Sequence, residues 1–343
     1  MLINRAKRVA LVGAAALGLC FTSQAQAGIV LPAPINGITT ITYGDFDVYS
    51  LPFLNFLATG STNQLGDFEV QSTPGAIKDL VVVATGSDGV PVNTNFAGMD
   101  NALQTPGAAM GVETFFTQPA NEPGEVAPFA TDNTGTWDAE ISALRNFLGG
   151  DDLLIFFNLN ENNEAGAVLD AAQDILVYAE ISLVDVDGVL PDMVFTLNGI
   201  NPDPILNTFT NFGTFDFGNG DVDDVAQVHG EICVNTATQT LIRLGPCEGG
   251  DGPNAATINQ NLGADRAAFA LTNQSLSDII NDLGTLYDVL RLDFRMGELS
   301  NGFEQLFLTS IERPVDIPAP GALGLLGLGL AGLGLGMRKR RRK

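Results

Sequence analysis

The sequence predicts a mainly β protein: an antiparallel β-sandwich-like domain with two or three short helices, followed by a C-terminal transmembrane helix. Two observations lead to this fold class. Apolar runs of four to ten residues, rich in β-branched and aromatic side chains, alternate with Gly, Asn, Asp and Pro, as strands and turns do. Long helical repeats are few, which favours sheets packed on sheets. A chain of 343 residues is long enough for a sizeable core.

Eight apolar runs are the predicted strands. One of them, 289–295, alternates apolar and polar side chains, which predicts one buried and one solvated face. Asn-Gly and Asp-Gly pairs between the runs mark turns. The predicted strands are 79–85, 153–159, 175–184, 193–197, 231–235, 240–243, 289–295 and 303–309.

Two helices are predicted from apolar residues at helical spacing. The first, 137–148, has Thr136 or Asp138 as its candidate N-cap and Gly149 as its stop. The second covers 275–283.

The charge is strongly acidic and unevenly distributed. The chain has 40 acidic and 16 basic residues, and nine of the basic ones lie in residues 1–27 and 338–343. The middle of the chain therefore has seven basic residues and all 40 acidic ones. Such a surface repels nucleic acid and attracts cations. With one His and no Cys-x-x-Cys pair, zinc and haem sites with common ligands are also excluded.

Residues 1–27 have the pattern of a secretory signal peptide. Arg5, Lys7 and Arg8 precede an apolar run, 9–21, and Ala25-Gln26-Ala27 follows it. Signal peptidase is expected to cut after Ala27, which leaves Gly28 as the first mature residue. The alternative is an uncleaved anchor, although the apolar run is short for a membrane span.

The C-terminus has three parts. Pro318, Ala319 and Pro320 come first, then 17 uncharged residues (321–337), then six basic residues that begin at Arg338. A helix over 321–337 is about 26 Å long and just spans the hydrocarbon of the inner membrane. The basic cluster stays in the cytoplasm by the positive-inside rule, so residues 28–317 lie outside. The alternative is a plain tail anchor.

These three parts resemble the PEP-CTERM sorting signal of exported bacterial proteins, over about 26 residues. The usual motif is Pro-Glu-Pro, and this chain has Ala319 in the place of Glu. Segments 99–185 and 302–307 also resemble parts of some PEP-CTERM proteins, without any site to transfer. The resemblance implies an exosortase-like membrane protease as partner. It also implies a final position at the outer cell surface or in the extracellular matrix, as in a biofilm, of a Gram-negative bacterium.

Cys233 and Cys247 remain after signal-peptide cleavage, an even number in an oxidising compartment. A disulfide between them closes a loop of about 15 residues and is worth about 3 kcal/mol in the chain-entropy model. Two separately buried thiols are the alternative.

The candidate metal ligands are Asp221, Asp223 and Asp224. Asn219, Asp221 and Asp223 have the spacing that opens an EF-hand calcium loop. The pattern then breaks, because Asp224 stands where Gly is required. A second acidic loop, 185–188, has its Gly at the wrong position. Calcium is therefore a candidate ligand, and solvated loop acids are the favoured alternative; no other cofactor is predicted.

Catalysis has little support in the sequence. The one histidine, His229, follows Asp223-Asp224 and precedes Glu231, which favours a surface position, and no Gly-x-Ser-x-Gly elbow surrounds a serine. We therefore expect a protein that is not an enzyme. Three aromatic sites, Trp137, Phe115-Phe116 and Tyr43, are candidates for a sugar-stacking surface, and core positions are the favoured alternative.

The expected function is that of an exported structural or adhesive protein, and extracellular polysaccharide is a candidate partner. A calcium- or carbohydrate-binding, lectin-like module is the first alternative. A carbohydrate-active hydrolase is the second, because such an enzyme needs only two suitably placed carboxylates.

Overall fold

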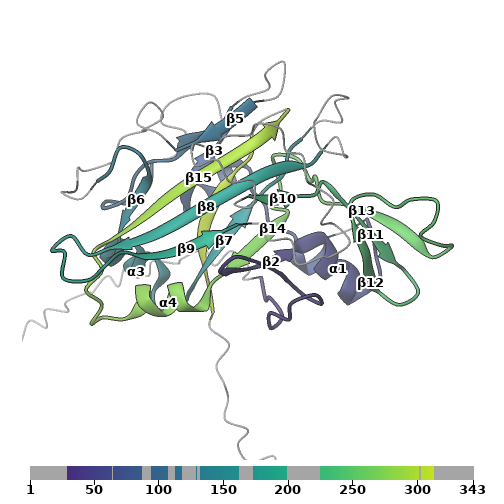
Figure 1. Cartoon of the computed structure of the whole chain (residues 1–343), viewed down its shortest axis with the longest axis horizontal. Helices are drawn as coiled ribbons and strands as arrows, with labels where there is room; N and C mark the ends of the chain where they lie inside the picture. The colour runs from purple at the N-terminus through teal and green to yellow at the C-terminus, as the bar shows by residue number, and fades with distance from the viewer. Residues whose placement is uncertain are drawn as a thin grey trace, which may run out of the picture.

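The computed structural model describes residues 29–63, 65–86, 94–106, 113–117, 129, 132–161, 173–198, 225–300 and 303–312. This part of the chain is mainly β, with three sheets (Figure 1). Every strand pair in them is antiparallel except β3 with β4. The helices are α1 (Leu51–Thr59), α2 (Pro74–Ile77), α3 (Ile141–Leu148), α4 (Gln274–Asn281) and a 3-10 turn, η1 (Gly66–Phe68).

Sheet one has seven strands in the order β1 (Ile41–Tyr43), β2 (Phe46–Ser50), β14 (Phe269–Thr272), β7 (Asp152–Phe157), β16 (Leu306–Ile311), β3 (Val81–Thr85) and β4 (Leu103–Gln104). Sheet two has the order β10 (Ala226–Val228), β8 (Ile175–Val184), β15 (Val289–Leu299) and β5 (Glu113–Phe116); in addition, β6 (Trp137–Glu140) pairs with β15 and β9 (Met193–Leu197) with β8. Sheet three consists of β12 (Thr240–Leu244), β11 (Glu231–Asn235) and β13 (Ala255–Asn259).

Sheet one is apolar on both faces. Side chains alternate along β7, so that Ile155 and Phe157 join one apolar cluster while Leu154 and Phe156 join another. The first cluster is the main core, which sheet one shares with sheet two. The ring of Phe157 lies 6.2 Å from that of Phe294 on β15, so the two sheets pack face to face.

Helix α1 covers part of the other face of sheet one. Its Leu51 and Leu54 belong to the same cluster as Leu154, whereas its Phe56 packs with the buried residues of sheet three. Helix α1 therefore lies between sheet one and sheet three, at one end of the molecule (Figure 1). Ser50 Oγ caps it by accepting a hydrogen bond from the Phe53 amide at 3.3 Å.

Sheet two is polar on its outer face. Along β15, Leu292 and Phe294 point into the main core, and the alternating polar residues are half-buried. Among these, Arg295 donates to Asp293 at 3.1 Å and lies 5.5 Å from the ring centre of Tyr178 on β8, the long strand beside β15 in Figure 1. The alternation predicted for 289–295 is confirmed.

Each of the eight predicted strands corresponds to an observed strand, and the mainly β prediction is confirmed. The prediction that a helix begins at 137 is wrong, because Trp137–Glu140 forms β6 and pairs with β15. In this strand Trp137 and Ala139 reach the main core, so sheet pairing overrides the local helical spacing. The N-cap is therefore Glu140 rather than Thr136 or Asp138, while Gly149 ends the helix at φ 65° as predicted.

No helix among the described residues is long and apolar enough to cross a bilayer. The predicted span, 321–337, lies outside the described residues.

Replacing Leu154 by Ala tests whether the second face of sheet one contributes to stability. Leu154 is fully buried on that face, so Leu154→Ala should lower the free energy of unfolding by about 3 kcal/mol. Leu283, which is 86% exposed after α4, supplies the matched control, and Leu283→Ala should cost less than about 0.5 kcal/mol. Urea unfolding measures both values, and equal effects would contradict the two-faced packing.

Candidate functional site

Most of the site residues predicted from the sequence lie outside the described part of the chain. These residues are Ala27, Gly28, Pro318, Ala319, Pro320 and Arg338 for processing, and Asp221, Asp223 and Asp224 for calcium. All of them stay predictions. In the second acidic loop, the carboxylate of Asp185 accepts hydrogen bonds from the amides of Asp187, Val189 and Leu190, so the loop folds around its own carboxylate.

The cysteine pair is joined as predicted. Cys233 on β11 and Cys247 in the loop after β12 form a disulfide, with Cα atoms 4.8 Å apart, and residues 236–239 make the turn between the two strands. Within the described residues, the one group of three potential metal ligands is this pair with Asp251. Metal ligation needs thiolates, so the bonded sulfurs make this group a structural feature.

The prediction of a surface position for His229 is wrong. The ring is buried, and its Nδ1 lies 2.8 Å from Asp174 Oδ2. Asp174 also accepts hydrogen bonds from the Gly230 amide and the Gln227 side chain, each at 2.9 Å. Asp174 precedes β8 and is 55 residues away in sequence, so the neighbours of His229 in the sequence gave no sign of it.

The His229–Asp174 pair is two thirds of a catalytic triad, but its third member is lacking in the described part of the protein. No hydroxyl or thiol of a described residue hydrogen-bonds to the imidazole, whereas a nucleophile needs that contact for activation. The geometry indicates that the pair joins the start of β8 to the connection between β10 and β11.

An interior cavity of about 130 Å³ lies between sheets one and two. Its walls are mainly apolar and come from both sheets, for example Ile155 and Phe157 on one side and Ile181 and Phe294 on the other. Residues of β11 and β12 also line it, so the cavity lies toward the end of the sandwich that carries sheet three.

Two polar side chains that line the cavity have an unpaired oxygen. Thr40 and Gln260 are each 3% exposed, and neither Thr40 Oγ1 nor Gln260 Oε1 has a hydrogen-bond partner among the residues that the structure describes. Gln260 is held in place by its other end, since its Nε2 donates to the His229 carbonyl at 2.8 Å. A buried polar atom without a partner costs about 1–3 kcal/mol, so these two oxygens mark places where a polar group would be stabilised.

Tyr43 also lines the cavity, and burial raises the pKa of its hydroxyl to about 12. The phenol therefore stays neutral at physiological pH. A mainly apolar cavity with two unpaired oxygens suits a small neutral molecule better than an ion.

The aromatic residues considered for sugar stacking do not form one surface. Trp137 and Phe115 are buried in the main core, Phe116 is 41% exposed on the edge strand β5, and Tyr43 lies at the cavity. The favoured alternative, core positions, is confirmed for Trp137 and Phe115.

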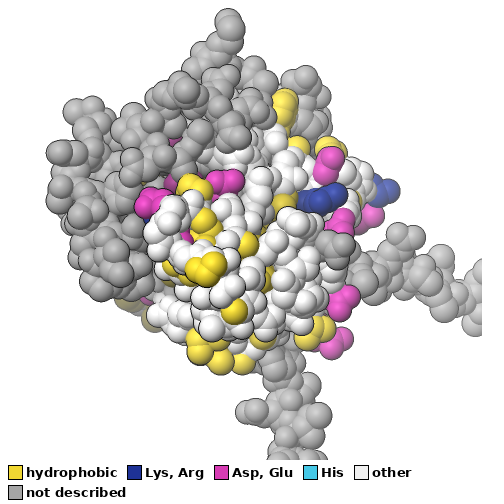
Figure 2. Space-filling view, turned by 90° about the vertical axis from the view of Figure 1, so that its right-hand side faces the viewer, with side chains coloured by type: hydrophobic (Ala, Val, Ile, Leu, Met, Phe, Trp, Pro, Cys, Tyr) yellow, Lys and Arg dark blue, Asp and Glu magenta, His cyan; other side chains and the backbone are white. Residues whose placement is uncertain are grey.

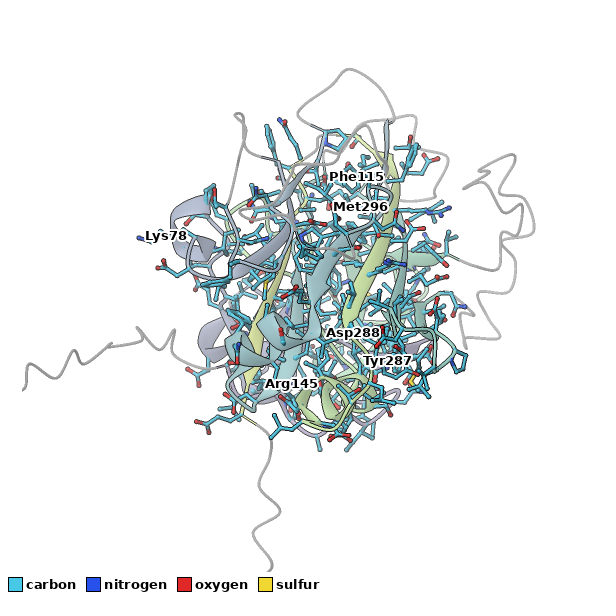
Figure 3. All side chains as sticks on the ribbon, turned by 90° about the vertical axis from the view of Figure 1, so that its left-hand side faces the viewer. Lys78, Phe115, Arg145, Tyr287, Asp288 and Met296 are labelled. Carbon is cyan, nitrogen blue, oxygen red and sulfur yellow. A yellow bond between two sulfur atoms is a disulfide. The ribbon has the colours of Figure 1, made fainter. Side chains whose placement is uncertain are left out.

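An open, polar depression of about 440 Å³ lies elsewhere, beside α3. Figure 3 shows Arg145, Tyr287 and Asp288, which line it, toward one end of the molecule. Arg145 donates to the carbonyls of Ile280 and Asp282, and Asp288 accepts from the Val186 amide. Because these groups already have protein partners, the interior cavity is the stronger candidate for a binding site.

A family model described as a domain of unknown function (DUF8239) matches residues 29–295. The chain belongs to this family. No curated protein and no solved structure matches the chain. The DUF8239 region contains the disulfide, the His229–Asp174 pair and both unpaired oxygens of the cavity, and it ends within β15, before β16.

The cavity residues of this DUF8239 protein carry no signal in the sequence. Thr40 and Gln260 are single polar residues just outside the short strands β1 and β13, and 220 positions separate them in the chain. Only the packing of the two sheets brings them to one cavity.

Removal of the disulfide should destabilise the protein. The bonded cysteines are 14 positions apart in the sequence. The double variant Cys233→Ala with Cys247→Ala should therefore lower the free energy of unfolding by about 3 kcal/mol. Chemical denaturation measures the loss. As a check on the bond itself, alkylation of the native protein without reductant should label neither sulfur; labelling of both would contradict the assignment.

Proposed function

We propose that this DUF8239 protein is an exported, non-enzymatic component of the cell surface or extracellular matrix of a Gram-negative bacterium, with a structural or adhesive role. The observation that carries the proposal is the order of the chain: a signal-peptide pattern, a folded β domain with a disulfide, and a Pro-Ala-Pro, apolar and Arg-rich terminus. Disulfides persist in oxidising compartments, which agrees with export.

The site geometry supports a role other than catalysis. The single histidine has its carboxylate partner but no nucleophile among the described residues. The acidic surface supports exposure to solvent and cations rather than to nucleic acid. On the end that carries sheet three, Figure 2 shows acidic side chains at several separate places and basic ones at its upper right.

Cell fractionation with intact-mass measurement tests export and processing together. We expect a mature protein that starts at Gly28, lacks the Arg-rich tail and is found in the envelope or matrix fraction. Ala319→Glu restores the usual motif and should increase the processed fraction. Full-length protein in the cytosol, with both termini intact, would contradict the proposal.

Binding of a small neutral molecule is a second candidate function, and the interior cavity favours it. An engineered apolar cavity of about 150 Å³ holds one benzene molecule, and this cavity has a similar size. The unpaired Thr40 hydroxyl can donate or accept a hydrogen bond, and Gln260 Oε1 can accept one. A molecule with one aromatic ring and one hydroxyl group therefore matches the volume and the chemistry of the cavity.

Calorimetric titration with phenol and with benzene tests this binding. We expect saturable binding of both, with phenol the tighter ligand by about tenfold, the worth of one hydrogen bond. Thr40→Val keeps the shape but removes the hydroxyl, so it should reduce the advantage of phenol and leave benzene unchanged. Ala179→Leu, which fills the cavity from β8, should abolish both; absence of binding to the unaltered protein would remove this candidate function.

A further inference from the structure

Two buried glutamates meet where β7 ends and β16 begins. Phe157, the last residue of β7, pairs with Leu306, the first of β16. Glu161 follows β7 and Glu304 precedes β16, so this pairing brings the two carboxyl groups into contact. Glu161 is 5% exposed and Glu304 is fully buried.

The carboxylate oxygens of this pair differ in the donors that the described residues offer them. Glu161 Oε2 accepts hydrogen bonds from the backbone amide and the hydroxyl of Ser300, at 2.6 and 2.5 Å. Among the described residues, Glu161 Oε1 and both oxygens of Glu304 have no donor in full hydrogen-bond geometry. The backbone amides of Glu304 and Asn160 lie near the Glu304 carboxyl group and lower its pKa, but less than burial and Glu161 raise it.

No basic side chain of the described residues forms an ion pair with either glutamate. The ion pairs among the described residues involve other carboxylates. Burial, together with the neighbouring Glu161, raises the pKa of Glu304 well above its usual range. Two carboxyl groups in contact in an apolar interior need either a cation, which lets both stay ionised, or a shared proton, which neutralises one of them.

We infer that Glu161 and Glu304 form a binding site for a divalent cation, calcium, with Glu161 Oε1 and both oxygens of Glu304 as protein ligands. Calcium takes six to eight oxygen ligands, mixes one- and two-oxygen carboxylate contacts and accepts water in the remaining positions. The three carboxylate oxygens would supply three of these ligands and two negative charges, and water would supply the others.

The bound ion would also connect two segments that are distant in the sequence. It would join the end of β7 to the connection between β15 and β16. The backbone is irregular on both sides of it: Glu298, near the end of β15, and Phe303, in the connection, have positive φ, 62° and 75°. The inference does not rest on the proposed function, because it uses only these two side chains and their surroundings.

Calorimetry and thermal melts with calcium, magnesium or a chelator test the site on the purified protein at neutral pH. We expect one calcium per chain and a melting temperature that rises with calcium and falls with chelator. Glu304→Gln and Glu161→Gln should each weaken calcium binding about tenfold or more, because the charge of the ligand set determines affinity. Glu312→Gln, at an exposed position, is the matched control and should bind like the unaltered protein.

Stability without calcium separates loss of the site from loss of the fold. Glu304→Gln removes one of two like charges, so without calcium it should melt at the same temperature as the unaltered protein or higher, and it should no longer respond to the ion. A combined Asp221→Asn, Asp223→Asn and Asp224→Asn variant should keep the response. The inference is overturned if calcium leaves the unaltered protein unchanged, as for a shared proton, or if Glu304→Gln keeps the full response.

Discussion

The structure depends on one constraint: sheet one is apolar on both of its faces. Along β7, β16 and β3 the inward side chains belong to the main core and the outward ones to a second cluster. Such a sheet cannot have water on either side. Sheet two therefore covers one face, and α1, α2 and the segments beside them cover the other. Sheet two needs only one buried face, which is why its outer side can be polar.

Sheet three lies outside the main core and is held by a covalent bond as well as by packing. Its own core is small and consists of Ile232, Val234 and Ile258 with Phe56 of α1. A core of this size supplies little stability. The Cys233–Cys247 disulfide holds β11 to the loop after β12, and the Gln239 side chain donates to the carbonyl of Phe56 at 3.2 Å. Sheet three is thus joined to the sandwich through α1 and reinforced within itself.

The fold could be predicted where burial requires a clear pattern of apolar residues in the sequence. The eight predicted strands are rich in β-branched and aromatic residues, whereas three of the strands that were missed, β1, β10 and β4, have only three, three and two residues. Helix α1 was missed because it is buried against two sheets and has no polar face to produce a helical period. The disulfide could be predicted because only two cysteines follow the predicted signal peptide. The other pairs, His229–Asp174, Thr40–Gln260 and Glu161–Glu304, each join segments that are distant in the sequence. Pairings of that kind arise from topology, and no local pattern encodes them.

The scarcity of basic residues makes each buried acid informative. With seven basic residues between the two termini, few buried carboxylates can have an ionic partner. Asp138 has one, Arg291 at 3.4 Å, and even so burial raises its pKa to about 6. Asp174 and Asp185 instead accept hydrogen bonds from backbone amides and neighbouring side chains. These donors stabilise the carboxylate charge without an ion pair to Lys or Arg. Glu161 and Glu304 differ from these acids because two carboxyl groups meet in the interior, and among the described residues no ion pair involves either of them. The contact between two like charges is the reason to expect a ligand at this place.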